Sequence, residues 1–330
     1  MLHNVFKVLE PSEEKDYRVM ACFGFSLVRS MLRRLEKRCR SLGLIEKTFP
    51  LRDSVTVMRC WVPDRASPGY DPSKPPLMLI HGFAANGIAG WEHQLPDLSR
   101  NFALYVPDLV FFGGSTTSDE RARSEFFQAR CMLEILEAEG VDGAAVAGTS
   151  YGGFVAFRMA ELDPARVKRV VIASSGVCMD PHSNDAILDA FQARHIHEVL
   201  MPSSIAVQKK SIQLCLYKRL WLPDFFVRDL MEVYGGNRKE RIELLDGLVI
   251  GTEAAQPLPK LSQEVLILVG SHDRIFDLEL AKQLKAHLGE NAMLVVIEKT
   301  GHVPQVERPK EFNKHLQAFL ILTSPVGQPR

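Results

Sequence analysis

The chain of 330 residues carries 40 basic and 40 acidic side chains, so its formal net charge is zero. A neutral chain has no overall field that would attract nucleic acid or a polyanionic substrate, and we expect no nucleic-acid partner. The composition, 46% hydrophobic and 24% charged, is typical of a globular protein. The length suffices for one large α/β domain with an inserted subdomain, or for two small domains.

The six cysteines are scattered and form no C-x-x-C pair, a pattern typical of reduced thiols in a reducing compartment. The first residues, MLHNVFKVLEPSEEKD, lack the basic start and apolar run of a secretory signal. No stretch approaches the roughly 18 consecutive apolar residues that a membrane-spanning helix needs. We therefore expect a soluble, cytoplasmic protein.

Residues 1–49 are predicted to form an N-terminal amphipathic helical extension. Between Tyr17 and Leu44, apolar side chains recur at spacings of three and four, and arginine and lysine crowd the rest of the helix. Such a helix either packs on the domain with a solvated basic face or lies on an anionic membrane surface. Peripheral membrane contact through residues 17–44 is therefore an open alternative, as is a targeting role.

Short apolar runs with turn residues at their ends predict a parallel sheet that is buried on both faces. After a strand over Val55–Val62, these runs are LMLIH (77–81), FALYVP (102–107), AAVAG (144–148), VKRVVIA (167–173), VLILVG (265–270) and MLVVI (293–297). Helical stretches lie between them, at about 120–139, 152–163 and 278–288. This alternation indicates an α/β fold with a doubly wound, mostly parallel sheet, formed by residues 50–177 and 260–330.

One long interval interrupts the alternation. Between Ser174 and Pro259 no convincing buried strand occurs, and the sequence is helical, with Met, Phe, Trp and Tyr among charged residues. The alternation resumes at Val265. We interpret residues 178–259 as a helical cap that is inserted between two strands and lies over the strand ends.

The segment Gly148-Thr149-Ser150-Tyr151-Gly152 directly follows a predicted strand and directly precedes a predicted helix. In this context G-x-S-x-G forms a nucleophile elbow, a sharp turn that lifts the serine hydroxyl above the sheet. The glycines permit the close backbone approach that the turn requires. Ser150 is therefore the candidate nucleophile.

A serine hydroxyl needs a base to take its proton, and the base needs a carboxylate to orient it. With this elbow the expected chain order is serine, acid, histidine. Asp273 lies just past the strand VLILVG and is the candidate acid, and His302 lies in the loop after the last strand and is the candidate base. Asp277 is the rival to Asp273, but its place before Leu278 suits a helix cap better.

Two backbone N–H groups are expected to stabilise the developing oxyanion. One belongs to Phe83, after the strand LMLI, and the other to Tyr151, which follows the nucleophile. The imidazole of His81 would be misplaced in the chain order as a base, and Asp108 follows a strand as a turn residue. We expect both of these side chains to be structural.

The segments HGF, VPDLVFFGGS, GTSYGG, GSHDRIFD and GHVPQVERP stand in the order found in capped α/β-hydrolases. The chain resembles plant members near the monoacylglycerol-lipase-like and meta-cleavage-product hydrolase groups. The resemblance extends from about Pro50 to Leu322 and is weaker across the cap. It implies that the residues singled out above act together, as a triad of Ser150, Asp273 and His302 and an oxyanion hole of Phe83 and Tyr151.

The resemblance leaves the substrate open, because this fold supports many reactions. Cleavage of a small-molecule or lipid-like ester through an acyl-enzyme on Ser150 is the main expectation, and the cap's aromatic and aliphatic residues suggest an apolar acyl or aromatic pocket. Carbon–carbon bond hydrolysis of a diketone-like substrate is one alternative. A receptor role is another, since some plant proteins of this fold keep the triad and act as hormone receptors. A serine nucleophile excludes epoxide hydrolase and haloalkane dehalogenase chemistry, which needs a carboxylate there.

No cofactor or metal is expected. G-x-G-x-x-G is absent from the sequence, which argues against a dinucleotide. His195 and His197 are close in sequence, but no accompanying pattern of Cys, Asp or Glu makes a credible metal site.

Overall fold

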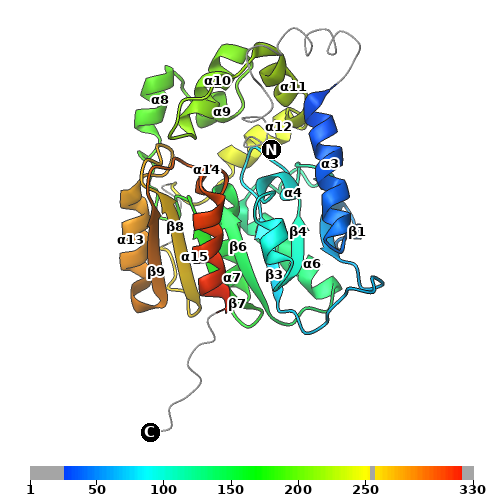
Figure 1. Ribbon diagram of the computed structural model, residues 1–330. Helices are drawn as coiled ribbons and strands as arrows, with labels where there is room; N and C mark the ends of the chain where they lie inside the picture. Colours follow the sequence, from blue (N-terminus) through cyan, green and yellow to red (C-terminus); the bar gives the residue numbers. More distant parts are fainter. Residues whose placement is uncertain (1–25, 253–256, 322–330) are drawn as a thin grey trace.

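The computed structural model describes residues 26–252 and 257–321, and these form a central sheet with helices on both faces (Figure 1). The six apolar runs are strands close to their predicted positions: β3 (Pro76–Ile80), β4 (Ala103–Pro107), β6 (Ala144–Thr149), β7 (Val167–Ala173), β8 (Glu264–Gly270) and β9 (Ala292–Ile297). The strand predicted at Val55–Val62 is β2 (Thr56–Pro63). Two further strands are β1 (Leu44–Pro50) and the short β5 (Thr116–Thr117).

The strand order is β1-β2-β4-β3-β6-β7-β8-β9, with β5 paired to β2. All neighbours from β4 to β9 run parallel, whereas β2 is antiparallel to β1, β4 and β5. The predicted doubly wound, mostly parallel α/β fold is confirmed.

Each face of the sheet buries its own apolar layer. Met78 and Ile80 of β3 point into one layer, and Leu77 and Leu79 point into the other. The first layer is covered by α6 (Glu125–Ala138), α7 (Tyr151–Leu162) and α13 (Leu278–Leu288). The second is covered by α3 (Leu27–Ser41), α4 (Gly87–Gly90), α5 (Leu95–Leu98) and α15 (Pro309–Ile321). Burial on both faces explains why the strands are continuous apolar runs.

The N-terminal helix is shorter than predicted, and part of the predicted range, before Ser26, lies outside the described residues. Helix α3 begins after the cap residue Ser26 and ends at Ser41. Gly43, with a φ of 78°, turns the chain, and residues 44–50 form β1. The prediction that residues 1–49 are a helical extension is therefore wrong at its end, where the backbone pairs with β2 along seven residues.

The apolar side of α3 is used within the chain. Val28 is buried in a cluster with Phe226, and Leu35 and Cys39 are buried against the sheet. Asp229 accepts hydrogen bonds from the Val28 amide (2.8 Å) and the Ser26 hydroxyl (2.6 Å). Among the described residues, no helix is both long and apolar enough to cross a membrane.

In the described part of the interval between β7 and β8 lie five helices, which we call the cap helices: α8 (Asp185–Phe191), α9 (Ile196–Leu200), α10 (Ile205–Leu214), α11 (Asp224–Tyr234) and α12 (Arg238–Asp246). They lie together at one end of the molecule, beyond α14 (Pro304–Glu307) (Figure 1). Helix α11 packs against α3. No strand occurs in the described part of this interval.

Candidate active site

A single residue, Ser150, separates β6 from α7. Its backbone has φ 54° and ψ −122°, a conformation that costs energy for a residue with a side chain, and its amide donates to the Ala173 carbonyl (2.8 Å). A Cβ on Gly148 would lie 2.0 Å from the Gly152 carbonyl oxygen, and one on Gly152 would lie 2.4 Å from the Ile80 carbonyl oxygen. Only glycine fits at both positions, so the sharp turn depends on this pair of glycines.

The structure brings the three predicted triad residues together from the ends of β6, β8 and β9. The Ser150 hydroxyl lies 3.0 Å from His302 Nε2, and His302 Nδ1 lies 2.9 Å from Asp273 Oδ2. The Asp273 and His302 side chains are almost entirely buried, with exposures of 0% and 7%. These distances suit transfer of the hydroxyl proton to Nε2 while the Nδ1–H group donates to the carboxylate.

The Asp273 carboxylate is held from a second side. Its Oδ1 atom accepts hydrogen bonds from the amides of Ile275 (2.9 Å) and Phe276 (3.1 Å). The Phe276 ring also packs edge-on against the His302 imidazole, with centroids 5.6 Å apart. The rival carboxylate, Asp277, accepts from the Leu280 amide (3.1 Å) and caps α13. The neighbouring loop therefore fixes Asp273 in the orientation that His302 meets.

The loop after β3 lies directly against Ser150. A Cβ on Gly82 would stand 3.1 Å from the Ser150 Cβ, so the backbone of this loop closes over the serine. The hydrogen bonds found among the described residues leave the amides of Phe83 and Tyr151 without an acceptor. The two rings pack on each other, with centroids 6.1 Å apart. An oxyanion hole needs two N–H donors that have no other acceptor, and the amides of Phe83 and Tyr151 meet this condition.

His81 anchors this loop from within the core. Its Nδ1–H group donates to the Gly82 carbonyl (2.6 Å), and its Nε2 atom accepts from the Leu109 amide (2.9 Å). The side chain is fully buried, and burial lowers the pKa of His81 to about 4. His81 is therefore neutral at pH 7 and forms no described hydrogen bond with the triad.

Asp108 holds the turn after β4. Its carboxylate accepts from the amides of Gly87 (2.8 Å) and Gly114 (3.0 Å) and pairs with Arg59 (3.2 Å). Burial raises the pKa of Asp108, although the Arg59 guanidinium opposes this shift. The contacts of Asp108 are those of a structural residue.

Sequence reasoning missed the residues through which the cap reaches the triad loops. The His302 amide donates to the Cys215 carbonyl (2.9 Å), and the Arg274 guanidinium donates to the Leu216 carbonyl (3.0 Å). Glu307 accepts from Gly301, next to His302, at 2.6 Å. The segment GHVPQVERP contains Glu307, but the sequence does not reveal that its partners are backbone amides.

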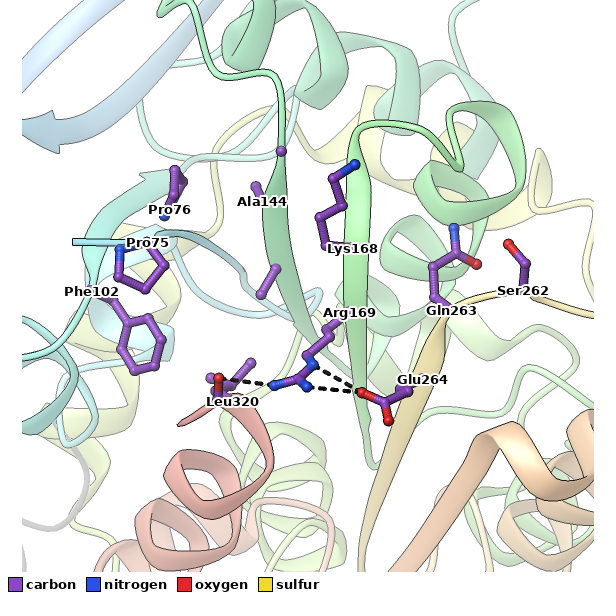
Figure 2. Close-up of a pocket in the computed structure, with 12 residues that line it drawn as sticks. Pro75, Pro76, Phe102, Ala144, Lys168, Arg169, Ser262, Gln263, Glu264 and Leu320 are labelled. Carbon is purple, nitrogen blue, oxygen red and sulfur yellow. Dashed lines mark hydrogen bonds and ion pairs between the residues drawn. The ribbon is translucent and has the colours of Figure 1, made fainter. Parts of the chain in front are cut away.

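A recess of about 420 Å³ opens at the end of the sheet where β3, β6 and β8 begin (Figure 2). The candidate triad lies at the other end, where the strands finish. Arg169 crosses it, and its guanidinium pairs with Glu264 (3.0 Å) and donates to the Leu320 carbonyl (3.1 Å). This arginine links the sheet to α15 and is neutralised there. We therefore assign a structural role to the residues of this recess, which lies remote from Ser150.

Within the described residues, no group of three or more His, Cys, Asp or Glu could hold a metal ion. His195 and His197 stack on each other, with ring centroids 5.1 Å apart, and His197 lies 3.7 Å from Asp246.

Comparison with known proteins supports the α/β-hydrolase fold of this chain. Residues 75–195 match the family described as the alpha/beta hydrolase fold. Lipase 3 of Moraxella sp. (strain TA144) is 26% identical over 256 residues, which are 74% of this chain and 76% of the lipase. The 2-hydroxymuconate semialdehyde hydrolase of Pseudomonas sp. (strain CF600) is 25% identical over 256 residues, 74% of this chain and 86% of that enzyme. The crystal structure of a membrane phospholipase A, described as a bacterial virulence factor, has a TM-score of 0.73 at 23% identity, covering 92% of this chain and 95% of that chain.

Proposed function

We propose that this chain, which belongs to the α/β-hydrolase superfamily, is a serine hydrolase that cleaves carboxylic esters through an acyl-enzyme on Ser150. The observation that carries the proposal is the pair of contacts at His302: 3.0 Å from Nε2 to the Ser150 hydroxyl and 2.9 Å from Nδ1 to Asp273. A relative named as a lipase supports ester cleavage.

In the proposed mechanism, Ser150 Oγ attacks the ester carbonyl carbon while His302 Nε2 takes the hydroxyl proton. Asp273 holds the imidazole and stabilises the imidazolium. The amides of Phe83 and Tyr151 stabilise the oxyanion of the tetrahedral intermediate. His302 then gives its proton to the departing alkoxide, so an alcohol leaves and the acyl group stays on Ser150. A water molecule that gives a proton to His302 then attacks the acyl carbon, and His302 returns the proton to Ser150 Oγ as the bond to the acyl group breaks and the acid leaves.

The substrate we propose is a small-molecule ester with an apolar acyl or aromatic group, or a lipid-like ester. Both Lipase 3 and the membrane phospholipase A are named for lipid esters, and they resemble this chain over 74% and 92% of its length. An apolar acyl group would gain most of its binding free energy from leaving water.

The proposal is tested by hydrolysis of nitrophenyl esters from acetate to palmitate, comparing wild type with Ser150→Ala and with the control Ser99→Ala. Ser99 is the C-cap residue of α5, and its hydroxyl donates to the Pro96 carbonyl (3.3 Å). Loss of turnover in Ser150→Ala alone would support the serine mechanism, and the best chain length would size the acyl site. Equal turnover in all three proteins would overturn it.

Carbon–carbon bond hydrolysis is the second candidate, and the relative named 2-hydroxymuconate semialdehyde hydrolase favours it. The same nucleophile and base would serve both reactions. Turnover of a vinylogous diketone acid, together with no turnover of any nitrophenyl ester, would favour this reaction over ester cleavage.

We also propose that the exposed side of α3 contacts an anionic membrane surface. Arg33, Arg34, Lys37 and Arg38 are exposed on one helix, and none forms an ion pair with another described residue. Because the apolar side of α3 is buried within the chain, this contact would be electrostatic and sensitive to salt. The proposed contact is therefore attraction between the basic side of α3 and anionic lipid headgroups, and not insertion of the apolar side of α3 into the membrane.

Co-sedimentation with vesicles tests the membrane contact. Wild type should bind vesicles that contain phosphatidylserine and should not bind pure phosphatidylcholine. It should detach at roughly 0.5 M salt, where the Debye length falls below about 5 Å. The variant Arg33→Glu/Lys37→Glu should lose binding. The matched control Lys310→Glu/Lys314→Glu makes the same charge change on α15. Equal binding by all three proteins would remove the idea.

A further inference from the structure

One segment of the cap, residues 213–218 at the end of α10, rests directly on the loop that carries His302. The His302 amide donates to the Cys215 carbonyl (2.9 Å). A Cβ on Gly301 would lie 2.6 Å from that same oxygen and 3.0 Å from the Tyr217 nitrogen. The two backbones therefore approach so closely that only glycine fits between them.

The same segment also contacts the loop that carries Asp273. Arg274 donates to the carbonyls of Gln213 and Leu216, the latter at 3.0 Å. The Tyr217 ring packs on the His272 ring, with centroids 4.5 Å apart. Residues 213–218 thus contact both loops that supply the candidate acid and base.

Glu307 joins the cap segment to the histidine loop. One carboxylate oxygen accepts from the Gly301 amide (2.6 Å), and the other accepts from the Tyr217 amide (2.9 Å). Both partners are N–H donors, so both positions on Glu307 must be acceptors. A carboxylate supplies two acceptor oxygens, whereas glutamine would turn an NH₂ group toward one of the amides.

We infer that Glu307 is a positioning residue that fixes His302. Through Glu307, the position of His302 depends on the contact between cap residues 213–218 and the histidine loop. The inference rests on the proposed role of His302 as base. Lifting residues 213–218 would break the hydrogen bond of the His302 amide and the bond between Glu307 and Tyr217. Any cap movement that admits substrate must therefore take place away from this segment.

The test compares wild type with Glu307→Gln and with the control Glu311→Gln. Glu311 lies one turn further on and pairs with Arg308 at 3.7 Å on the surface. Three quantities are measured on each protein: the downfield NMR resonance of the proton between His302 and Asp273, and the kcat and the KM for nitrophenyl acetate. The variant His302→Gln, which lacks that proton, assigns the resonance.

Glu307→Gln is expected to shift or broaden the resonance and to lower kcat at least about tenfold, because a displacement near 1 Å at a reacting group costs up to roughly a hundredfold. KM for the small acetate ester should stay within about twofold, since binding of that ester does not involve the base. Glu311→Gln should match wild type in all three values. Glu307→Asp, which keeps two acceptor oxygens, should recover part of the loss.

Thermal unfolding shows whether each variant is folded. If Glu307→Gln does not fold, Arg274→Gln replaces it, because that variant loosens the same segment from the other loop and should give the same spectral change. An unchanged resonance and an unchanged kcat in the folded variant would overturn the inference. A resonance that is shifted or broadened in Glu307→Gln but not in Glu311→Gln, with no ester turnover even in wild type, would uphold the inference and refute the proposed ester cleavage.

Discussion

Asp273 and Asp277 lie four residues apart in the loop after β8, and their carboxylates contact different elements. Asp273 binds His302 Nδ1 at 2.9 Å, whereas Asp277 accepts from the Leu280 amide at 3.1 Å and caps α13. The same substitution at the two positions therefore separates an effect on the reaction from an effect on the fold.

We expect Asp273→Asn to lower kcat/KM for nitrophenyl esters by on the order of 10³ to 10⁴, because an amide no longer stabilises the imidazolium of His302. Asp277→Asn should keep full activity, and its stability should change by less than about 0.5 kcal/mol, because asparagine is as good a helix cap as aspartate. Steady-state kinetics and urea unfolding measure both quantities. Loss of activity in Asp277→Asn alone would make Asp277 the acid.

His81 should make the protein less stable as the pH falls. Its pKa is about 4 in the folded chain, against the ordinary histidine value of 6.5, so the unfolded chain binds more protons between these values. The stability that the neutral, buried imidazole contributes is therefore fully present above pH 6.5 and is lost as the pH falls toward 4. The loss amounts to on the order of 3 kcal/mol across the window.

Urea unfolding of wild type and His81→Gln at pH 7, 6 and 5 tests this linkage. The variant lacks the titrating group, so its unfolding free energy should fall less steeply with decreasing pH than that of wild type. The two slopes should differ by up to about 1.4 kcal/mol per pH unit. A lower stability of the variant at pH 7 is expected, because the Leu109 amide loses the Nε2 acceptor. Parallel pH profiles for the two proteins would show that His81 does not titrate in this range.

The strands and the candidate triad could be predicted because their signals are local in sequence. A strand buried on both faces must be a continuous apolar run, and all four of Leu77, Met78, Leu79 and Ile80 are fully buried. The glycines around Ser150 are demanded by backbone contacts within the turn itself and with the neighbouring strand β3. Such local requirements restrict the types of neighbouring residues, so they can be recognised as a sequence pattern.

Features that depend on backbone atoms far away in the sequence produce no such sequence pattern. Strand β1, with the sequence LIEKTFP, buries only Leu44 and Phe49 and pairs with β2 at the edge of the sheet, so its sequence pattern does not distinguish it from the end of a helix. The carbonyl of Cys215 meets the His302 amide through geometry alone, and any residue type offers a carbonyl. The partners of Glu307 are likewise amides, which every residue except proline carries.

Glu125 and Arg158 form a buried ion pair between α6 and α7, at 3.2 Å and with side-chain exposures of 0% and 4%. Glu125 also accepts from the amides of Val249 and Ile250, in the chain that leads from the cap helices to β8. We expect Glu125→Gln to lower the unfolding free energy by about 3 kcal/mol, because the buried Arg158 then has Glu161 as its only carboxylate partner among the described residues.

The control for this prediction is Glu279→Gln. Glu279 pairs with Lys282 at 3.3 Å, but both side chains are more than half exposed, so its loss should cost less than about 0.5 kcal/mol. Urea unfolding of the two variants beside wild type gives the difference. Similar losses in both would mean that the buried pair contributes no more than the exposed one.

Gly113 and Gly140 provide a matched pair for the effect of backbone crowding. Both have positive φ, 53° and 67°, but a Cβ on Gly113 would lie 1.9 Å from Asp108 Oδ2, whereas nothing lies within 4 Å of one on Gly140. Gly140→Ala should therefore cost only the strain of a left-handed residue, about 1 to 2 kcal/mol. Gly113→Ala adds a collision that must displace Asp108 from its amide partners, and we expect a total loss above about 3 kcal/mol. Urea unfolding measures the loss of unfolding free energy in each variant. Equal losses would mean that the turn after β4 can shift enough to admit a side chain.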